Sequence, residues 1–215
     1  MTTRRSPNPV QRRRTLCDVA IRLLAEGGLK NATHLRIDRA AALPDGTTSF
    51  YFRTSSALLR AVAERVAELD LKDLTAATRE ARDASRPSGL AALVARSATG
   101  VRLVRTKARN ELGLQAARDP VLAEALRGYT EVFSALIRDA VVQLQPPGSK
   151  TDSAVVDAQT YAVTTFVGGV MLSLATANRS VQTAVELDFY ISAIVRGVGT
   201  EFAGATHRNR AIKRG

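Results

Sequence analysis

The residues that could do chemistry are concentrated at positions 33–52, in a stretch that combines small hydroxyls with an aromatic end. Its central run is Thr47, Thr48 and Ser49. Short hydroxyl side chains at the leading end of a helix can enter the major groove of DNA without steric obstruction, and they can donate or accept hydrogen bonds at base edges. This run therefore predicts DNA recognition.

Two short helices joined by a tight turn would position these hydroxyls. Thr33 can cap the first helix, and Ile37 marks the buried side of that helix. Pro44 and Gly46 cannot continue a regular helix, so they place the turn directly after it. The second short helix then covers residues 46–52, and the two helices together have the form of a helix-turn-helix unit.

The basic excess of the chain coincides with this unit. The formal net charge is +11, and residues 1–60 hold 11 Lys and Arg against 4 Asp and Glu. Residues 61–203 hold 16 of each kind, whereas residues 204–215 add four basic side chains. Phosphate contacts supply most of the sequence-independent affinity for DNA, and they need positive charge beside the reading helix. For the tail at 204–215, a merely solubilising role is an equal alternative.

Composition bounds the class of protein. With 215 residues and 45% apolar content, the chain can form one or two domains with a buried core. Cys17 is the only cysteine, which excludes an intramolecular disulfide and favours a reducing compartment. The expected location is therefore the cytoplasm, and a DNA-binding protein would be associated with the nucleoid there. The charge-free stretch 158–178 contains a glutamine, threonines and a glycine pair, so it suits a buried helix better than a membrane span.

Apolar periodicity predicts helices along almost the whole chain. In the first helix, at about 10–26, Cys17 falls on the apolar stripe, which predicts a packed thiol rather than a reactive one. Beyond the helix-turn-helix unit, the expected helices are 55–84, 89–104, 106–118, 120–145, 153–178 and 183–203. The sequence shows no alternating β pattern of any length. The expected fold is all-α, with about nine helices.

Catalytic and metal-binding chemistry finds little support. His34 and His207 are the two histidines, and neither has a second ligand at zinc spacing. No nucleophile and base can be paired from such peripheral imidazoles. Carboxylate pairs such as Glu64 and Glu68 suit solvated helix faces. We therefore expect neither enzyme activity nor a metal or cofactor.

Residues 12–66 resemble the N-terminal region of the TetR family of bacterial transcriptional regulators. The shared features include the Thr33 cap, Ile37, the run Gly46-Thr47-Thr48 and the aromatic pair Tyr51-Phe52. The rest of the chain matches that family only in the number and length of its expected helices. The resemblance is therefore specific for the N-terminal part.

This resemblance implies a division of the chain into two working parts. A three-helix DNA-binding domain would occupy residues 8–54, with its motif at 33–52. A helical domain for effector binding and dimerisation would follow at 55–203. Residues 1–7 and 204–215 would be basic flexible tails.

The resemblance also implies roles for individual side chains at the DNA. Thr33 would donate to a phosphate at a helix N-terminus, and Tyr51 would hydrogen-bond another phosphate, with Phe52 as its buried partner. The hydroxyls at 47–49 would face base edges. The full predicted DNA-binding set is Thr33, Arg36, Arg39, Gly46, Thr47, Thr48, Ser49, Phe50, Tyr51 and Arg53.

Three positions depart from the family pattern. Ala42 stands where the family usually has glycine, so the turn is expected to be tighter or slightly altered. Asp45 stands where lysine is common, and its carboxylate would repel phosphate. Phe50 stands where a polar residue is frequent, which points to apolar contact with thymine methyl groups.

The last two expected helices suit a homodimer interface. A face of small residues on 153–178 allows close helix approach, and 183–203 carries a broad apolar stripe. A dimer would supply the two-fold symmetry that a palindromic operator requires. The predicted interface residues are Ala162, Thr165, Gly169, Leu172, Thr176, Leu187, Tyr190, Ile191, Ile194 and Val198. The alternative is that both stripes are intramolecular core.

The resemblance further implies an effector cavity among the middle helices. Apolar bulk with a few polar groups is the usual lining of a small-molecule pocket, and few charges are available here, so we expect a neutral or apolar effector. The predicted lining residues are Val101, Leu112, Gln115, Phe133, Ile137, Tyr161, Thr164 and Thr165. Each of them could equally be ordinary core.

The expected function is that of a sequence-specific DNA-binding transcriptional regulator. The preferred form is a repressor that a small-molecule effector releases from a palindromic operator. Two other classes remain open. One is an architectural DNA-binding protein without an effector. The other is an all-α ligand-binding protein or enzyme with a basic arm.

Overall fold

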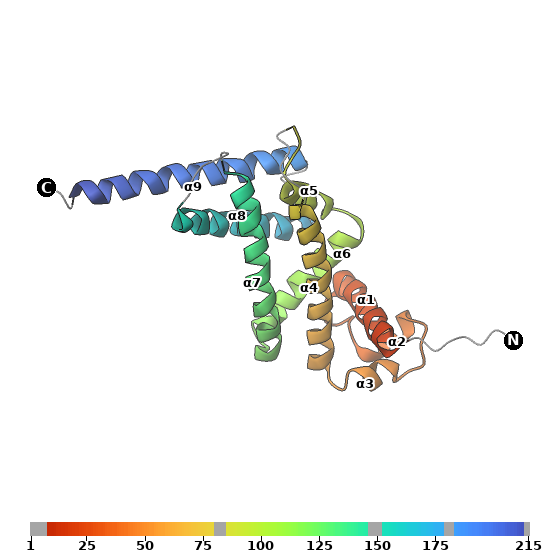
Figure 1. The fold of residues 1–215 in the computed structure, drawn as a ribbon. Coiled ribbons are helices and arrows are strands. Elements are labelled where there is room, and N and C mark those ends of the chain that lie inside the picture. The colour runs from red at the N-terminus through yellow and green to blue at the C-terminus, as the bar shows by residue number, and fades with distance from the viewer. Residues whose placement is uncertain (1–7, 80–84, 146–151, 179–182, 213–215) are drawn as a thin grey trace. The chain divides into compact units, whose positions relative to one another are not determined.

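The structure is a computed structural model that describes the backbone of residues 8–79, 85–145, 152–178 and 183–212, with side chains as far as Phe202. These ranges contain nine helices and no strand (Figure 1). The predicted all-α class is therefore confirmed.

The chain divides into two compact units, which are described separately. Unit 1 comprises residues 1–70 and 99–129, and unit 2 comprises residues 71–98 and 130–215. Helices α4 (Ser55–Arg79) and α7 (Pro120–Gln143) contribute to both units. Unit 1 extends past the predicted domain boundary at residue 55. It also includes α6 (Gly100–Ala116), because this helix packs against α1 (Pro9–Gly27).

In unit 1, α1 is followed by α2 (His34–Ala40) and α3 (Thr47–Tyr51). The Asn8 side chain accepts a hydrogen bond from the backbone N–H of Val10 at 3.0 Å and so caps α1. Pro9 occupies the first turn, where the missing N–H costs nothing.

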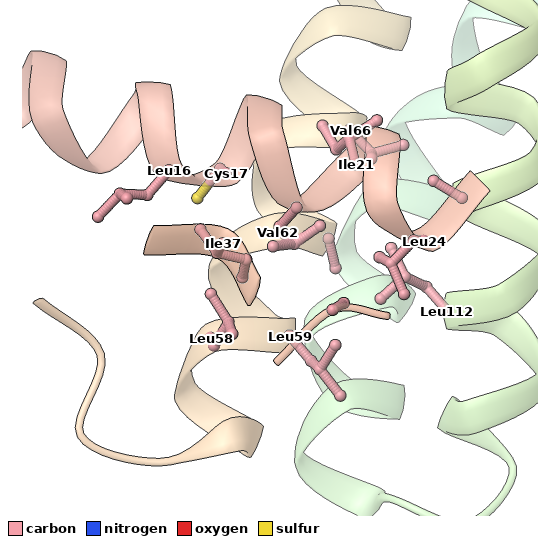
Figure 2. Close-up of a cluster of buried hydrophobic side chains, with 14 of the residues drawn as sticks. Leu16, Cys17, Ile21, Leu24, Ile37, Leu58, Leu59, Val62, Val66 and Leu112 are labelled. Atoms are coloured by element: carbon pink, nitrogen blue, oxygen red, sulfur yellow. The ribbon is translucent and has the colours of Figure 1, made fainter. Parts of the chain in front are cut away.

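A buried apolar cluster joins α1, α2, α4 and α6 in unit 1. Figure 2 shows that side chains from all four helices converge on it, and the labelled members are Leu16, Cys17, Ile21, Leu24, Ile37, Leu58, Leu59, Val62, Val66 and Leu112. Burial raises the pKa of the Cys17 thiol to about 12. Cys17 is 3% exposed, so the prediction of a packed thiol is confirmed.

Ion pairs at the edge of this cluster tie the same helices together. Arg65 on α4 donates to Asp18 on α1 at 2.9 Å and to Glu68 at 2.9 Å, and these hydrogen bonds raise the pKa of its guanidinium. Asp70 on α4 pairs with Arg105 at 3.1 Å and also with Arg109, both on α6. The Asp70 and Arg105 side chains are only 11% and 12% exposed, so solvent screens this pair weakly.

Unit 2 is built from α5 (Gly89–Arg96), α8 (Ser153–Ala175) and α9 (Ala184–Ile212), together with the ends of α4 and α7 that belong to it. Helices α8 and α9 pack against each other. Gln159 of α8 donates to the Val195 carbonyl at 2.7 Å, and Phe166 lies against Tyr190 with ring centroids 6.0 Å apart. Since the later residue of α8 meets the earlier residue of α9, the two helices run antiparallel.

Within the described residues, α8 alone is long and apolar enough to cross a bilayer, with a mean hydropathy of 1.2. Length and composition are weak indications, because core helices of globular proteins pass the same test.

Some of the predicted helix boundaries are wrong. The helix expected at 89–104 ends at Arg96, and α6 begins at Gly100. Gly100 has a φ of 58°, a left-handed conformation that interrupts a right-handed helix between the two. The last helix also extends beyond its expected end at 203, to Ile212.

The turn after α2 keeps the conformation that a glycine would adopt. Ala42 has a φ of 52°, and the Leu43 N–H donates to the Asp38 carbonyl at 2.9 Å. This pairing, across five residues and with a left-handed residue inside it, is the Schellman ending of a helix. The turn is therefore not tightened. Instead, an alanine carries the strain of a left-handed backbone.

We expect Ala42→Gly to stabilise the protein by roughly 0.5–1 kcal/mol, because the left-handed penalty of about 1–2 kcal/mol for an L-residue exceeds the entropic cost of glycine. Gly46→Ala is the matched comparison, because it places an alanine at a second left-handed position. The φ of Gly46 is 93° and no atom lies within 4 Å of an added Cβ, so Gly46→Ala should destabilise through backbone conformation alone. Urea unfolding monitored by circular dichroism measures both changes. A destabilising Ala42→Gly would contradict the assignment of strain.

Candidate nucleic-acid interface

The N-terminus of α2 carries the predicted cap. Thr33 has an extended backbone, with φ of −91° and ψ of 152°, and its hydroxyl accepts from the Arg36 N–H at 3.4 Å. A contact of this length is weak, and Thr33 is exposed. Its hydroxyl hydrogen is not needed for the cap, so it can be donated to an anion at this helix end.

The N-terminus of α3 is held by a buried carboxylate of α2. Asp38 has no exposed surface; one of its oxygens accepts from the Gly46 N–H at 2.8 Å, and the other accepts from the N–H of Thr48 at 2.7 Å. The second oxygen also accepts from the Thr48 hydroxyl at 2.5 Å. Since Gly46 has no side chain to cap α3, Asp38 supplies the capping oxygens from another helix.

These hydrogen bonds to Asp38 show that two predicted DNA contacts are wrong. Thr48 does not face base edges, because its side chain is fully buried against Asp38. Gly46 cannot offer its N–H to DNA, because that donor is already bound to the same carboxylate. Its role is conformational, as the left-handed residue that begins α3.

The C-terminal end of α3 is held by two further side chains. The Arg13 guanidinium donates to the Tyr51 carbonyl at 2.8 Å and lies 4.4 Å from the centre of the Phe52 ring. The His34 Nε2 donates to the Phe52 carbonyl at 2.7 Å, since a carbonyl can only accept. Phe52 itself is 1% exposed, which confirms its predicted burial.

The outward surface of α3 is formed by the remaining residues of the hydroxyl and aromatic run. Ser49 and Phe50 are exposed, and Phe50 keeps 73% of its surface open to solvent. Thr47 is half-buried, and its hydroxyl donates to the Pro44 carbonyl at 2.7 Å. The half-buried Tyr51 ring packs edge-on against Phe50, with centroids 5.2 Å apart. The Phe50 ring is therefore accessible for contact on the outward surface of α3.

The predicted phosphate-binding arginines all lie on the surface. Arg36 donates to the Asn31 side chain, and Arg39 approaches Asp45 to 3.8 Å. The side chains of Arg39 and Asp45 are 68% and 62% exposed, so this ion pair is weak and can open to a phosphate. Arg53 is exposed directly after α3.

The positioning roles of Arg13, His34 and Asp38 were not predicted from the sequence. A local signal existed for Asp38, because it follows Ile37 on the same buried arc of a short helix, where a charged side chain demands a partner. Arg13 gave no such signal, since its partner lies 38 residues away in the sequence.

No protein-family model and no curated protein sequence matches this chain. Solved structures do match. A Pseudomonas aeruginosa PAO1 protein assigned as a transcriptional regulator superposes with a TM-score of 0.72 at 19% identity, over 94% of this chain and 95% of that one. A TetR-family member from Streptomyces coelicolor A3 superposes with 0.64 at 20% identity, over 89% and 98%. The multidrug binding protein EbrR, solved with imidazole, gives 0.61 at 20% identity, over 90% and 96%.

This chain has the TetR-regulator fold. The superposed structures span nearly the whole chain, although four residues in five differ from it.

In the TetR fold of this chain, the predicted effector residues fall in different surroundings. Leu112 and Ile137 are wrong as lining residues, because each is fully packed in the apolar core of its own unit. Val101 and Tyr161 are 73% and 75% exposed. Gln115, Phe133 and Thr164 are half-buried, and the exposed Thr165 donates its hydroxyl to the Tyr161 carbonyl at 2.9 Å.

The predicted dimer residues also differ in burial, from fully buried to exposed. Leu187 and Ile191 are wrong as interface residues, because they are buried within this chain in the core of unit 2, alongside residues of α5 and α8. Exposed members are Thr165, Gly169, Leu172, Thr176 and Tyr190, and half-buried members are Ala162, Ile194 and Val198. Two exposed apolar residues of α9 were missed, Val185 at 68% and Phe189 at 63%.

Among the described residues, no group of three or more His, Cys, Asp or Glu is placed to hold a metal ion. The exposed residues on and beside α3 offer hydrogen-bond donors, positive charge and one aromatic ring, and such groups can contact nucleic acid.

Proposed function

We propose that this protein is a sequence-specific DNA-binding transcriptional regulator in which residues 8–54 contact an operator. The observation that carries the proposal is the arrangement of α3. Side chains from α1 and α2 hold both of its ends, and Ser49 and Phe50 remain exposed. A rigid short helix with an open outer face can read base edges in the major groove.

The surroundings of α3 support the same proposal. Thr33 at the start of α2 and the exposed Arg36, Arg39 and Arg53 provide donors for phosphate on the same small domain. Phosphate contacts fix the register of a protein on DNA, and base contacts then select the sequence. Phe50 cannot donate or accept a hydrogen bond, so we propose that it contacts thymine methyl groups.

A gel shift of the purified protein on the DNA upstream of its own gene tests this function. We expect a complex with that DNA that outcompetes an unrelated duplex, and an affinity that falls steeply with salt as phosphate counterions are released. Equal affinity for both duplexes at every salt concentration would contradict sequence-specific regulation and favour an architectural role.

Two variants separate the contacts within the same experiment. Thr47→Ala should reduce the discrimination between cognate and mutated sites by about 1–3 kcal/mol, because it removes a base contact. Tyr51→Phe should weaken binding to all sequences by about tenfold, because it removes a phosphate donor. Thr200→Ala, an exposed threonine on α9 of unit 2, is the control and should change neither quantity.

We further propose that the protein works as a homodimer through the open faces of α8 and α9. Tyr161, Leu172, Val185 and Phe189 expose 53–75% of their surface on these two helices. The small residues Thr165 and Gly169 share the face of Leu172 at helical spacing, which would let a second copy approach closely. A two-fold dimer matches a palindromic operator.

Leu172→Glu should shift the protein from dimer to monomer in analytical ultracentrifugation. A charge at the centre of an apolar interface costs at least about 2 kcal/mol, which weakens the dimer more than tenfold. Leu114→Glu is the matched control, since Leu114 is 70% exposed on α6 of unit 1 and should leave the dimer intact. The opposite pattern, with Leu114→Glu dissociating the dimer, would move the interface to α6.

The preferred form of this regulator is a repressor whose DNA complex is released by a neutral or apolar effector bound in unit 2. Helix α8 has no charged residue after Asp157. The Thr164 hydroxyl is buried and makes no hydrogen bond to any described residue, so it is available to a ligand. An effector that prefers the form with displaced reading helices would shift the population away from DNA binding.

EbrR has also been solved with ethidium, a cationic aromatic compound. We expect uncharged phenanthridine, the parent ring system of ethidium, to raise the melting temperature of this protein more than ethidium does, because α8, which carries Thr164, has no carboxylate after Asp157 to pair with a cation. Thr164→Val should reduce the shift if the hydroxyl binds the ring nitrogen. Stabilisation by ethidium alone would contradict a neutral effector.

A further inference from the structure

Helix α3 is too short to hold its own position. It contains five residues, Thr47–Tyr51, and isolated helices shorter than about 12–15 residues are marginal in water. Its orientation must therefore come from contacts to other elements. At its leading end, where base readout would begin, three hydrogen bonds converge on Asp38.

Both oxygens of the Asp38 carboxylate accept hydrogen bonds in these contacts. One oxygen accepts one N–H and the other accepts an N–H and a hydroxyl, all within 2.8 Å. Because Asp38 and Thr48 are both fully buried, water cannot replace any of these partners. The leading end of α3 is thus tied to the body of α2 through the side chain of Asp38.

We propose that Asp38 is the positioning residue for sequence readout, and that it acts through Thr48 without touching DNA. This inference rests on the proposed DNA-binding function and adds to it the internal contact that sets specificity. The N–H groups of Gly46 and Thr48 are occupied by the chain's own carboxylate, so they are not free to bind a phosphate.

Electrostatics and positioning make opposite predictions for the loss of this charge. Removing an acidic group near DNA strengthens binding if only charge matters, because the carboxylate repels phosphate. Removing the anchor of α3 weakens specific binding if positioning matters. Asp45 provides the comparison, since it belongs to the same turn, carries the same charge and is 62% exposed without bonding to α3.

Asp38→Asn and Asp45→Asn form the decisive pair. An asparagine at position 38 keeps the shape but has one acceptor oxygen, so its NH₂ group must face an N–H donor. We expect Asp38→Asn to weaken binding to the upstream DNA by about tenfold to a hundredfold, with a smaller change on unrelated DNA. Asp45→Asn should strengthen binding to both duplexes. Tighter binding by both variants, with unchanged discrimination, would overturn the proposal.

The hydroxyl of Thr48 gives a second test with little change in shape. Thr48→Val removes the donor to Asp38 and should reduce discrimination between the two duplexes, whereas Thr48→Ser retains the donor and should keep discrimination near the wild-type value. If Asp38→Asn does not fold, as judged by its thermal melt, this pair decides the question. Equal discrimination by the Thr48→Val and Thr48→Ser variants would then count against the proposal.

Hydrogen exchange separates this inference from the function on which it rests. In the free protein, the amides of Gly46 and Thr48 should be protected, and Asp38→Asn should expose them without exposing the amides of α1. If the wild-type protein shows no preference for its upstream DNA, the proposed function fails while this protection still reports the anchor. If the preference exists but Asp38→Asn retains it, the function stands and the positioning role fails.

Discussion

The arrangement at α3 depends on one constraint: a helix of five residues is too short to be stable alone, so contacts with neighbouring elements must hold its position. Three side chains provide such contacts, with Asp38 at the leading end and Arg13 and His34 at the trailing end. These three are themselves fixed because α1 and α2 pack into the apolar cluster of unit 1. The order of dependence runs from the buried cluster to the polar anchors, and from them to the exposed residues that would meet DNA.

Features that are encoded locally could be predicted from the sequence. The Thr33 cap, the turn before Gly46, the burial of Cys17 and the closing Phe52 each follow from a few adjacent residues and a 3.6-residue period. The long helices followed for the same reason, because many periodic positions fix a face. Where a helix break depended on one residue, at Gly100, the boundary was misplaced.

Features that depend on tertiary contacts could not be predicted in this way. Thr48 looked like a groove-facing hydroxyl, because five residues contain too few periodic positions to define which side is buried. Leu187 and Ile191 look the same in sequence whether their stripe meets another helix of the same chain or a second copy. Only the packing of α5 and α8 around them shows that they are core, which leaves Val185 and Phe189 as the open apolar residues of α9.

The turn between α2 and α3 shows how a strained backbone can persist. Ala42 holds a left-handed conformation that costs an L-residue about 1–2 kcal/mol. Asp38 sits four residues earlier and makes three hydrogen bonds across the same turn, and a hydrogen bond to a charged group contributes roughly 1.5–3 kcal/mol. Even one such bond offsets the strain at Ala42. A turn secured by a buried carboxylate therefore does not require glycine at that position, so the alanine and the aspartate are best understood as a linked pair.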